Sequence, residues 1–97
     1  MSKYTLVKSK QYLRSYNKFL SSKANNKSAR RRLATALEKL LDGHPLPQNY
    51  KDHQLKGEFV AYRECHIKSD ILLVYQIKDE VLVLLLVDIG THSQIFQ

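Results

Sequence analysis

The 97-residue sequence has little cysteine, glycine or proline, and it lacks any long hydrophobic run. Its single cysteine, Cys65, excludes an internal disulfide and zinc sites built on paired cysteines, and we interpret it as a small buried hydrophobic residue. The longest apolar run, residues 81–87, has seven residues. Because a membrane-spanning helix needs about 20 apolar residues, the sequence predicts no membrane span. The amino terminus contains no apolar core of a secretory signal, and we therefore expect a cytoplasmic protein.

Familiar catalytic signatures are also missing. The glycines form no phosphate-binding loop, and the sequence contains neither a G-x-S-x-G nucleophile elbow nor an H-E-x-x-H zinc motif. Hydrophobic residues make up 43% of the chain and charged residues 26%, which is typical of a folded domain and not of a disordered chain. A chain of this length has room for a single core. We therefore predict one domain over residues 1–97.

Acidic residues are scarce in the first half of the chain. Residues 1–42 contain eleven lysines and arginines against Glu38 and Asp42, whereas residues 43–97 contain five against seven acidic residues. The formal net charge of +7 therefore comes wholly from the first half. A basic surface of this kind favours a polyanionic partner, either nucleic acid or an acidic protein. A solvated helix surface would give the same pattern.

Hydrophobic periodicity predicts two helices after a short β-favouring stretch at residues 4–7. Apolar residues recur at helical spacing over residues 9–22 and again over residues 29–41. Gly43 is a plausible residue to end the second helix. Arg30, Arg31 and Arg32 lie beside the second apolar stripe, and we expect them to point to solvent or to a partner.

The second half of the chain has the two-residue period of β-strands. The pattern predicts a strand over residues 59–67, with Cys65 and Ile67 on one face and Glu64 and His66 on the other. It predicts further strands at 71–77 and 81–87, the last of them central and covered on both faces, and a short turn at the carboxyl end. The long connection over residues 43–57 is typical of a functional loop. The order β-α-α-β-β-β predicts an α+β fold in which an N-terminal strand and a helical hairpin pack on a small antiparallel sheet.

Histidine is the residue type best suited to chemistry here. His53, His66 and His92 come from three separate predicted elements that could meet at one edge of the sheet, with Arg63 and Asp70 close to His66 in sequence. Such a cluster suits cleavage of RNA, because imidazole transfers protons near neutral pH and arginine holds phosphate. The same histidines and Asp70 also suit Zn or Mn, and the spacing alone leaves both chemistries and purely structural roles open. Candidate base-stacking residues are Tyr50, Tyr62 and Phe96.

Three blocks of sequence resemble the YafQ branch of the RelE toxin superfamily. They are Y-K-D-H-x-L-x-G at residues 50–57, Y-R-x-x-H at 62–66 and G-T-H-x-x-x-F at 90–96. The resemblance implies a RelE-like fold and a toxin of a type II toxin–antitoxin system, an mRNA interferase that cuts mRNA in the ribosomal A site without a metal or other cofactor. The partners that it implies are the 70S ribosome, mRNA and an acidic antitoxin that folds on binding. Operator DNA is expected only through the antitoxin.

By position, the resemblance implies a catalytic set of His53, His66, Asp70 and His92. We predict that His92 is the general acid and that Asp70 or His53 is the general base, with His66 and Arg63 stabilising the phosphate or orienting a neighbour. Phe96 would help to place the RNA. The predicted RNA-binding residues are Lys51, Arg63, Phe96, Arg30, Arg31 and Arg32, and no residue is predicted to bind a metal.

Two positions depart from this family pattern. Ile71 follows Asp70 where relatives often have tryptophan, which leaves base preference open. Asp88 stands where relatives commonly carry arginine. Either Arg63 or a lysine such as Lys51 neutralises the phosphate instead, or the protein cuts poorly, or Asp88 orients His92. Asp88 therefore supports an alternative function, a non-catalytic RNA- or antitoxin-binding module of the same fold. A metal-dependent nuclease is the third hypothesis.

Overall fold

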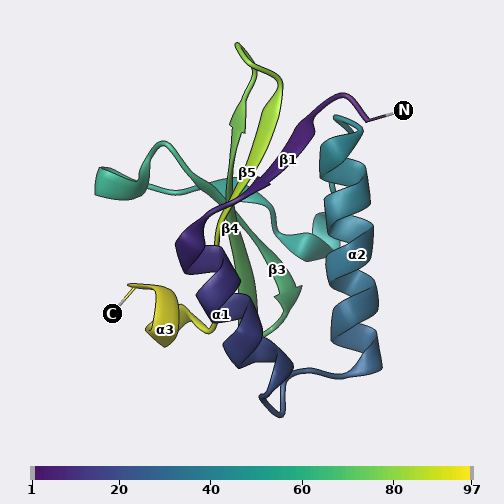
Figure 1. Ribbon diagram of the computed structural model, residues 1–97, viewed down its shortest axis with the longest axis vertical. Helices are drawn as coiled ribbons and strands as arrows, with labels where there is room; N and C mark the ends of the chain where they lie inside the picture. The colour runs from purple at the N-terminus through teal and green to yellow at the C-terminus, as the bar shows by residue number, and fades with distance from the viewer. Residues whose placement is uncertain (1, 97) are drawn as a thin grey trace.

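The computed structural model describes residues 2–96 and contains a five-stranded mixed sheet with two long helices on one face (Figure 1). The strand order is β1-β5-β4-β3-β2. β1 (Thr5–Lys8) pairs in parallel with β5 (Val83–Gly90), and β4 (Ile71–Lys78) pairs antiparallel with β5 and with β3 (Arg63–Lys68). β2 (His53–Gln54) adds a short antiparallel edge to β3. The predicted α+β class is confirmed, and the parallel β1 makes the sheet mixed instead of wholly antiparallel.

Each long helix begins at a polar side chain that caps it. Ser9 accepts a hydrogen bond from the Tyr12 amide (2.9 Å) at the start of α1 (Lys10–Leu20), and Asn26 accepts one from the Ala29 amide (2.8 Å) at the start of α2 (Lys27–Leu41). Gly43 follows α2 in a left-handed conformation (φ +76°), as predicted for the end of this helix. Within residues 2–96, no helix has the length and apolar character needed to cross a membrane.

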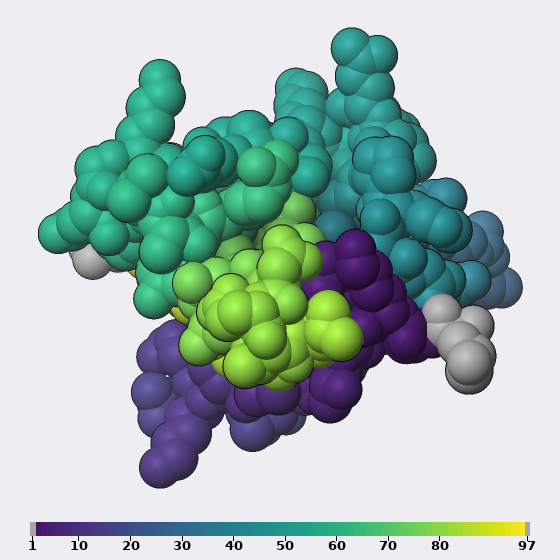
Figure 2. All heavy atoms as spheres, turned by 90° about the horizontal axis from the view of Figure 1, so that it is seen from above, coloured from purple at the N-terminus to yellow at the C-terminus, as the bar shows by residue number. Residues whose placement is uncertain are grey.

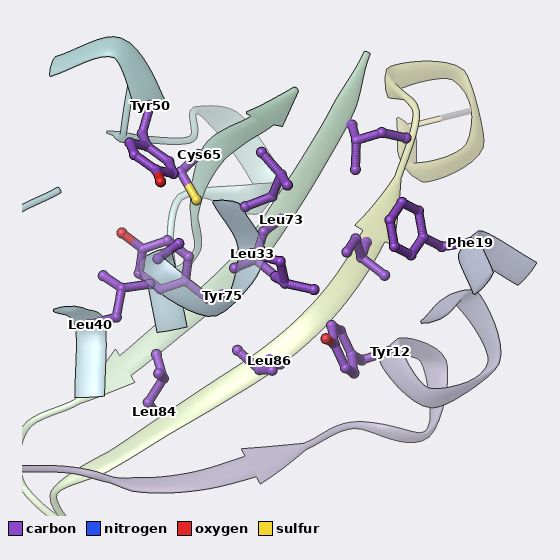
Figure 3. Packing of buried hydrophobic residues seen from close by; sticks show 14 of the residues in the cluster. Tyr12, Phe19, Leu33, Leu40, Tyr50, Cys65, Leu73, Tyr75, Leu84 and Leu86 are labelled. Carbon is purple, nitrogen blue, oxygen red and sulfur yellow. The ribbon is translucent and has the colours of Figure 1, made fainter. Parts of the chain in front are cut away.

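The core fills the space between the two helices and one face of the sheet (Figure 3). Cys65, on β3, is fully buried in it, and burial raises the pKa of its thiol to about 12. This confirms the interpretation of Cys65 as a small buried residue, and it leaves the thiol protonated and unfit as a nucleophile at neutral pH. Other core residues are Tyr12, Phe19, Ala29, Leu33, Ala36, Leu40, Ile67, Leu73, Tyr75, Leu84, Leu86 and Ile89.

β4, and not the strand predicted at residues 81–87, is the central strand of the sheet. The apolar run belongs to β5, which begins at Val83 because Val81 and Leu82 form an exposed turn. Figure 2 shows this end of the β4–β5 hairpin projecting beside β1. Over residues 83–87 the side chains of β5 alternate between less and more buried positions, whereas the first five residues of β4 are all buried. The position of β4 between β3 and β5 explains this burial, and an unbroken apolar run alone did not identify it.

The connection over residues 43–57 has structure of its own. It contains the 3₁₀ turn η1 (Gln48–Tyr50) and β2, and it leads into a second 3₁₀ turn, η2 (Gly57–Phe59). β3 therefore starts at Arg63 and not at residue 59 as predicted. Within β3 the predicted faces are confirmed: Cys65 and Ile67 point into the core, so Glu64 and His66 point to the opposite face of the sheet.

Arg32 differs from its exposed neighbours Arg30 and Arg31. Its Nε donates to the Ile67 carbonyl (2.5 Å) and its Nη2 donates to the His66 carbonyl (3.1 Å). These contacts are structural, and they contradict the prediction that this side chain points to solvent or a partner. We therefore leave Arg32 out of the RNA-binding set.

The two carbonyls that Arg32 binds lie at a β-bulge. The register between β3 and β4 shifts between His66 and Lys68, so Ile67 is an extra residue on β3. The Arg32 guanidinium also lies 4.1 Å from the centre of the Tyr50 ring. Tyr50 is itself buried, so it is not available to stack on a base. Arg32 thus joins α2, η1 and the bulge beside His66.

We predict that Arg32→Lys destabilises the protein by about 2 kcal/mol, because lysine keeps the charge but cannot bind two carbonyls while also packing on the Tyr50 ring. Arg31→Lys, on the exposed side of the same helix turn, should change the free energy of unfolding by less than about 0.5 kcal/mol. Urea unfolding of both variants measures the difference. Equal stabilities of the two variants would contradict the structural role of Arg32.

Candidate functional site

Two adjoining hollows lie beside the face of β3 that carries Glu64 and His66. The first has a volume of about 370 Å³ and the second about 260 Å³. Glu64 and His92 line both hollows, so the two cavities meet at these residues. The first is also lined by His53, Gln54, Leu55, Lys56, Phe59 and Phe96, and the second by His66, Ser69, Asp70, Leu72, Thr91 and Ser93. The fold therefore brings together all four residues of the predicted catalytic set.

Asp52 anchors the segment that carries His53. Its carboxylate accepts hydrogen bonds from the Tyr75 hydroxyl and from Arg63 Nη2, the latter at 3.3 Å. Burial, and next the hydrogen bond to Asp52, raise the pKa of Tyr75, which keeps the phenol protonated as a donor. Because Asp52 is fixed in this way, the following residue enters β2 directly opposite Glu64. The Y-K-D-H block thus has a structural residue, Asp52, beside a candidate catalytic one.

Arg63 and His66 lie on opposite faces of β3. It pairs with Tyr75 across the sheet, on the face that carries Cys65 and Ile67, and its guanidinium forms an ion pair with Asp52. Arg63 is therefore not placed to stabilise the phosphate beside His66, because odd and even positions of a strand point to opposite faces. Its contact with Asp52 is consistent with the other predicted role, which was to orient a neighbour.

Both ring nitrogens of His53 face oxygen atoms. Nδ1 lies 2.7 Å from the Lys51 carbonyl and Nε2 lies 3.2 Å from Glu64 Oε1. A carbonyl only accepts, so Nδ1 carries a proton. Nε2 and Glu64 Oε1 can then form a hydrogen bond only if one further proton lies between them, on the imidazole or on the carboxyl. The geometry of His53 and Glu64 is therefore suited to sharing one proton.

Glu64 is the functional candidate that the sequence analysis missed. Only 7% of the residue is exposed, and its second carboxyl oxygen, Oε2, has no hydrogen-bond partner among residues 2–96. A buried polar atom without a partner costs about 1–3 kcal/mol, and such groups in native proteins often have a functional reason. Glu64 stands two residues before His66, on the same face of the strand, and this spacing could have indicated that it belongs to the site. An isolated acidic residue in a strand, however, is ordinarily solvated, and no known motif includes it.

A capping box positions His92. The Thr91 amide donates to Gln94 Oε1 (2.8 Å) and the Gln94 amide donates to Thr91 Oγ1 (3.2 Å), which starts the short helix α3 (His92–Phe96). A Cβ at Gly90 would lie 2.7 Å from Gln94 Oε1, so glycine leaves room for this cap. One helical turn later, the Phe96 ring packs on the His92 ring with centroids 5.0 Å apart.

The second hollow contains the other two predicted catalytic residues. His66 is half-buried on β3, and Asp70 is exposed in the turn before β4. Ile71, at the position where the family resemblance led us to expect tryptophan, is 4% exposed and belongs to the hydrophobic core. An isoleucine at this position therefore contributes to packing and lines neither hollow.

Asp88 is half-buried on β5 and accepts a hydrogen bond from the Ile89 amide (2.8 Å). Across residues 2–96 it makes no hydrogen bond to His92. The carboxylate is therefore engaged by its own backbone, and the hypothesis that Asp88 orients His92 has no contact to support it. In the same range of residues, no three histidine, cysteine or acidic side chains are arranged to hold a metal ion.

Comparison with known proteins identifies relatives along almost the whole chain. Residues 4–97 match the family described as the bacterial toxin of type II toxin–antitoxin system, YafQ. A Haemophilus influenzae protein that carries the YafQ toxin name is 41% identical over 88 residues, which are 89% of this chain and 85% of that protein. The mRNA interferase toxin YafQ of Escherichia coli K12 is 40% identical over 52 residues, or 54% of each chain.

Solved structures of toxins have the same fold. A metal-bound toxin from Helicobacter pylori superposes with a TM-score of 0.84 at 36% identity, covering 96% of this chain and 99% of that one. The Escherichia coli DinJ–YafQ toxin–antitoxin complex gives a TM-score of 0.81 at 28% identity, covering 98% of this chain and 99% of that one. The chain therefore belongs to the YafQ family of bacterial toxins of type II toxin–antitoxin systems.

Proposed function

We propose that this protein is a ribosome-dependent mRNA endoribonuclease that cleaves mRNA in the ribosomal A site. The observation that carries the proposal is the junction of the two hollows, where Glu64 and His92 line both cavities between His53 on one side and His66 and Asp70 on the other. A phosphodiester at this junction lies within reach of proton donors and acceptors on both sides. The mRNA interferase activity named for the Escherichia coli relative supports the same reaction.

The reaction needs two proton transfers. A base removes the proton from the ribose 2′-hydroxyl, whose oxygen attacks the adjacent phosphorus, and an acid protonates the 5′-oxygen as its bond to phosphorus breaks. The products are a 2′,3′-cyclic phosphate and a 5′-hydroxyl, so the step consumes no water. His92, exposed where both hollows meet, is our general acid. The His53–Glu64 pair, once it has given up its shared proton, is our general base in place of Asp70.

Glu64 has a second role in this mechanism. Its unpartnered Oε2 is the buried acceptor that an arriving donor, such as the attacking 2′-hydroxyl, would satisfy. Deoxyribose lacks this hydroxyl, so the arrangement favours RNA over DNA. His66 and Asp70 lie on the far side of the junction, where protonated His66 would stabilise the phosphate charge. Lys51, exposed beside His53, is the cation that we propose in place of Arg63.

We predict that His92→Ala lowers cleavage of translated mRNA by about 1,000-fold, which is within the range expected for removal of a general acid. His92 is exposed, so the variant should keep the wild-type urea midpoint. The measurement is mapping of 5′ ends of cellular mRNA after induction of each protein. Undiminished cleavage by the variant would overturn the assignment of His92.

Two controls separate the alternatives. Wild-type protein that binds ribosomes but produces no cut would favour the non-catalytic binding module that Asp88 suggests. Loss of cleavage by purified protein and ribosomes after chelator treatment of the protein, with ribosomes restored to normal Mg²⁺, would favour the metal-dependent nuclease.

We predict that Glu64→Gln lowers kcat by about 100-fold with little change in KM, because glutamine fills the same space but cannot share a proton with His53. Glu58→Gln is the matched control, since Glu58 is exposed on η2 and lines neither hollow. Single-turnover cleavage of programmed ribosomes measures both variants. A Glu64→Gln enzyme as fast as the control would remove Glu64 from the mechanism.

The basic first half of the chain gives the protein its partner surfaces. Exposed cations on α1, on α2 and between them include Lys18, Lys23, Lys27, Arg30 and Arg31. We propose that this surface contacts ribosomal RNA phosphates and that an acidic antitoxin segment covers it in the neutralised complex. The complex of the Escherichia coli relative with DinJ supports an antitoxin partner. Operator DNA would bind only through that antitoxin.

We predict that reversing two charges, with Arg30→Glu and Arg31→Glu, weakens ribosome association at least tenfold at 0.1 M salt and lowers its dependence on salt. Lys3→Glu with Lys8→Glu makes the same change in net charge away from this surface and should have a much smaller effect. Co-sedimentation with 70S ribosomes over a salt series measures both. Equal losses for the two pairs would show that net charge, not this surface, controls binding.

A further inference from the structure

The first hollow has a character that acid–base chemistry does not require. Its walls are largely apolar, because Leu55, Phe59 and Phe96 contribute to them, and its volume of about 370 Å³ lies in the range of small-molecule pockets. The rings of Phe59 and Phe96 meet edge to face, with centroids 5.4 Å apart and an angle of 81° between their planes. The proposed proton transfer at the junction uses His53, Glu64 and His92. It gives no role to Leu55 or Phe59, and Phe96 has only the expected role of helping to place the RNA.

We infer that the first hollow is a nucleobase-binding subsite and that Phe59 is its stacking residue. This inference rests on the proposed function, and it assigns the nucleotide next to the cleaved phosphate to this cavity. A nucleobase is flat and apolar on its faces and polar at its edge, which fits aromatic walls with a few polar groups. Every base offers such a face, so stacking of this kind tolerates different sequences.

Gln54 supplies the polar group. Its Nε2 donates to the Val60 carbonyl (2.8 Å), which fixes the amide at the edge of the hollow. The amide oxygen, Oε1, has no hydrogen-bond partner within residues 2–96 and can accept from an N–H group on a base edge. The same hydrogen bond ties β2 to the residue that follows η2. It therefore fixes Gln54 relative to the turn that carries Phe59.

Continuity with the reaction centre explains why the occupant is a nucleotide and not an unrelated ligand. Phe96 contacts both Phe59 and the ring of His92, our general acid, with centroids 5.4 Å and 5.0 Å apart. A base held in this hollow is thus connected through one phenyl ring to the group that protonates the leaving oxygen. Lys56, also on the wall, is a cation within the cavity for the phosphate attached to that base.

The test uses ¹⁵N-labelled wild-type protein titrated with each of the four nucleoside 5′-monophosphates and, separately, with ribose 5-phosphate. These probes carry no 3′-phosphodiester, so they bind without being cleaved. We expect the four nucleotides to shift the amide signals of Gln54, Phe59 and Phe96 saturably. Ribose 5-phosphate, which has the sugar and phosphate but no base, should leave these signals unchanged. Equal shifts with ribose 5-phosphate would overturn the inference without any variant.

Phe59→Leu keeps an apolar side chain but removes the aromatic face, and we expect it to weaken nucleotide binding about tenfold. The matched control is Val60→Leu, because Val60 is 53% exposed on the same turn and its side chain lines neither of the two hollows. Well-dispersed amide spectra show that both variants are folded. Unchanged nucleotide affinity in folded Phe59→Leu would also overturn the inference.

The inference and the proposed function fail in different ways. Nucleotide binding that depends on Phe59, in a protein that never cuts translated mRNA, would keep the subsite and reject the nuclease. Cleavage of translated mRNA by a protein whose Gln54 and Phe59 signals ignore all four nucleotides would keep the nuclease and reject the subsite.

Discussion

The pleat of β3 is the constraint on which the rest of the site depends. Cys65 and Ile67 are fully buried beneath the helices, and this burial fixes which face of the strand meets the core. Glu64 and His66 must then face the other way, toward the two hollows. A shift of one residue would move Glu64 and His66 into the apolar core and move Cys65 and Ile67 out of it, so hydrophobic burial and placement of the site favour the same register. Arg32 secures the strand where its bulge would otherwise leave two carbonyls free.

Fixed anchors surround the site, while the two histidines that we propose as acid and base, His92 and His53, stay accessible. Asp52 is held by Tyr75 and Arg63 on the core side of the sheet, and this bond places His53 on the opposite side. At the carboxyl end, the cap formed by Thr91 and Gln94 starts the short helix α3 and so holds His92 in place. Both histidines remain exposed. Such division between supporting and reacting residues is what general acid–base catalysis needs, because the acid and base must be held in place yet reach the substrate.

The two halves of the chain have different roles in the proposed function. The helices bury one apolar face on the sheet and expose cations along the other, so they provide both half of the core and the surface for polyanions. The second half has few cations, and it builds the hollows and the groups that transfer protons. Such a separation lets one surface bind the ribosome over a wide area while the chemistry stays in a small cavity at the other side of the sheet.

The sequence by itself determined the α+β class, the two helices, the faces of β3 and the blocks that carry the histidines. These features follow from local periodicity and short motifs, since burial of a stripe or a strand face leaves a regular pattern of apolar residues. Only the tertiary structure decided that β4 is central, that Arg63 serves Asp52, that Arg32 is structural and that Glu64 joins the site. Each of these depends on contacts between residues distant in the chain, such as the 35 positions that separate Arg32 from Ile67. No local pattern encodes which distant atom a charged side chain will meet, and the packing of the sheet alone selects it.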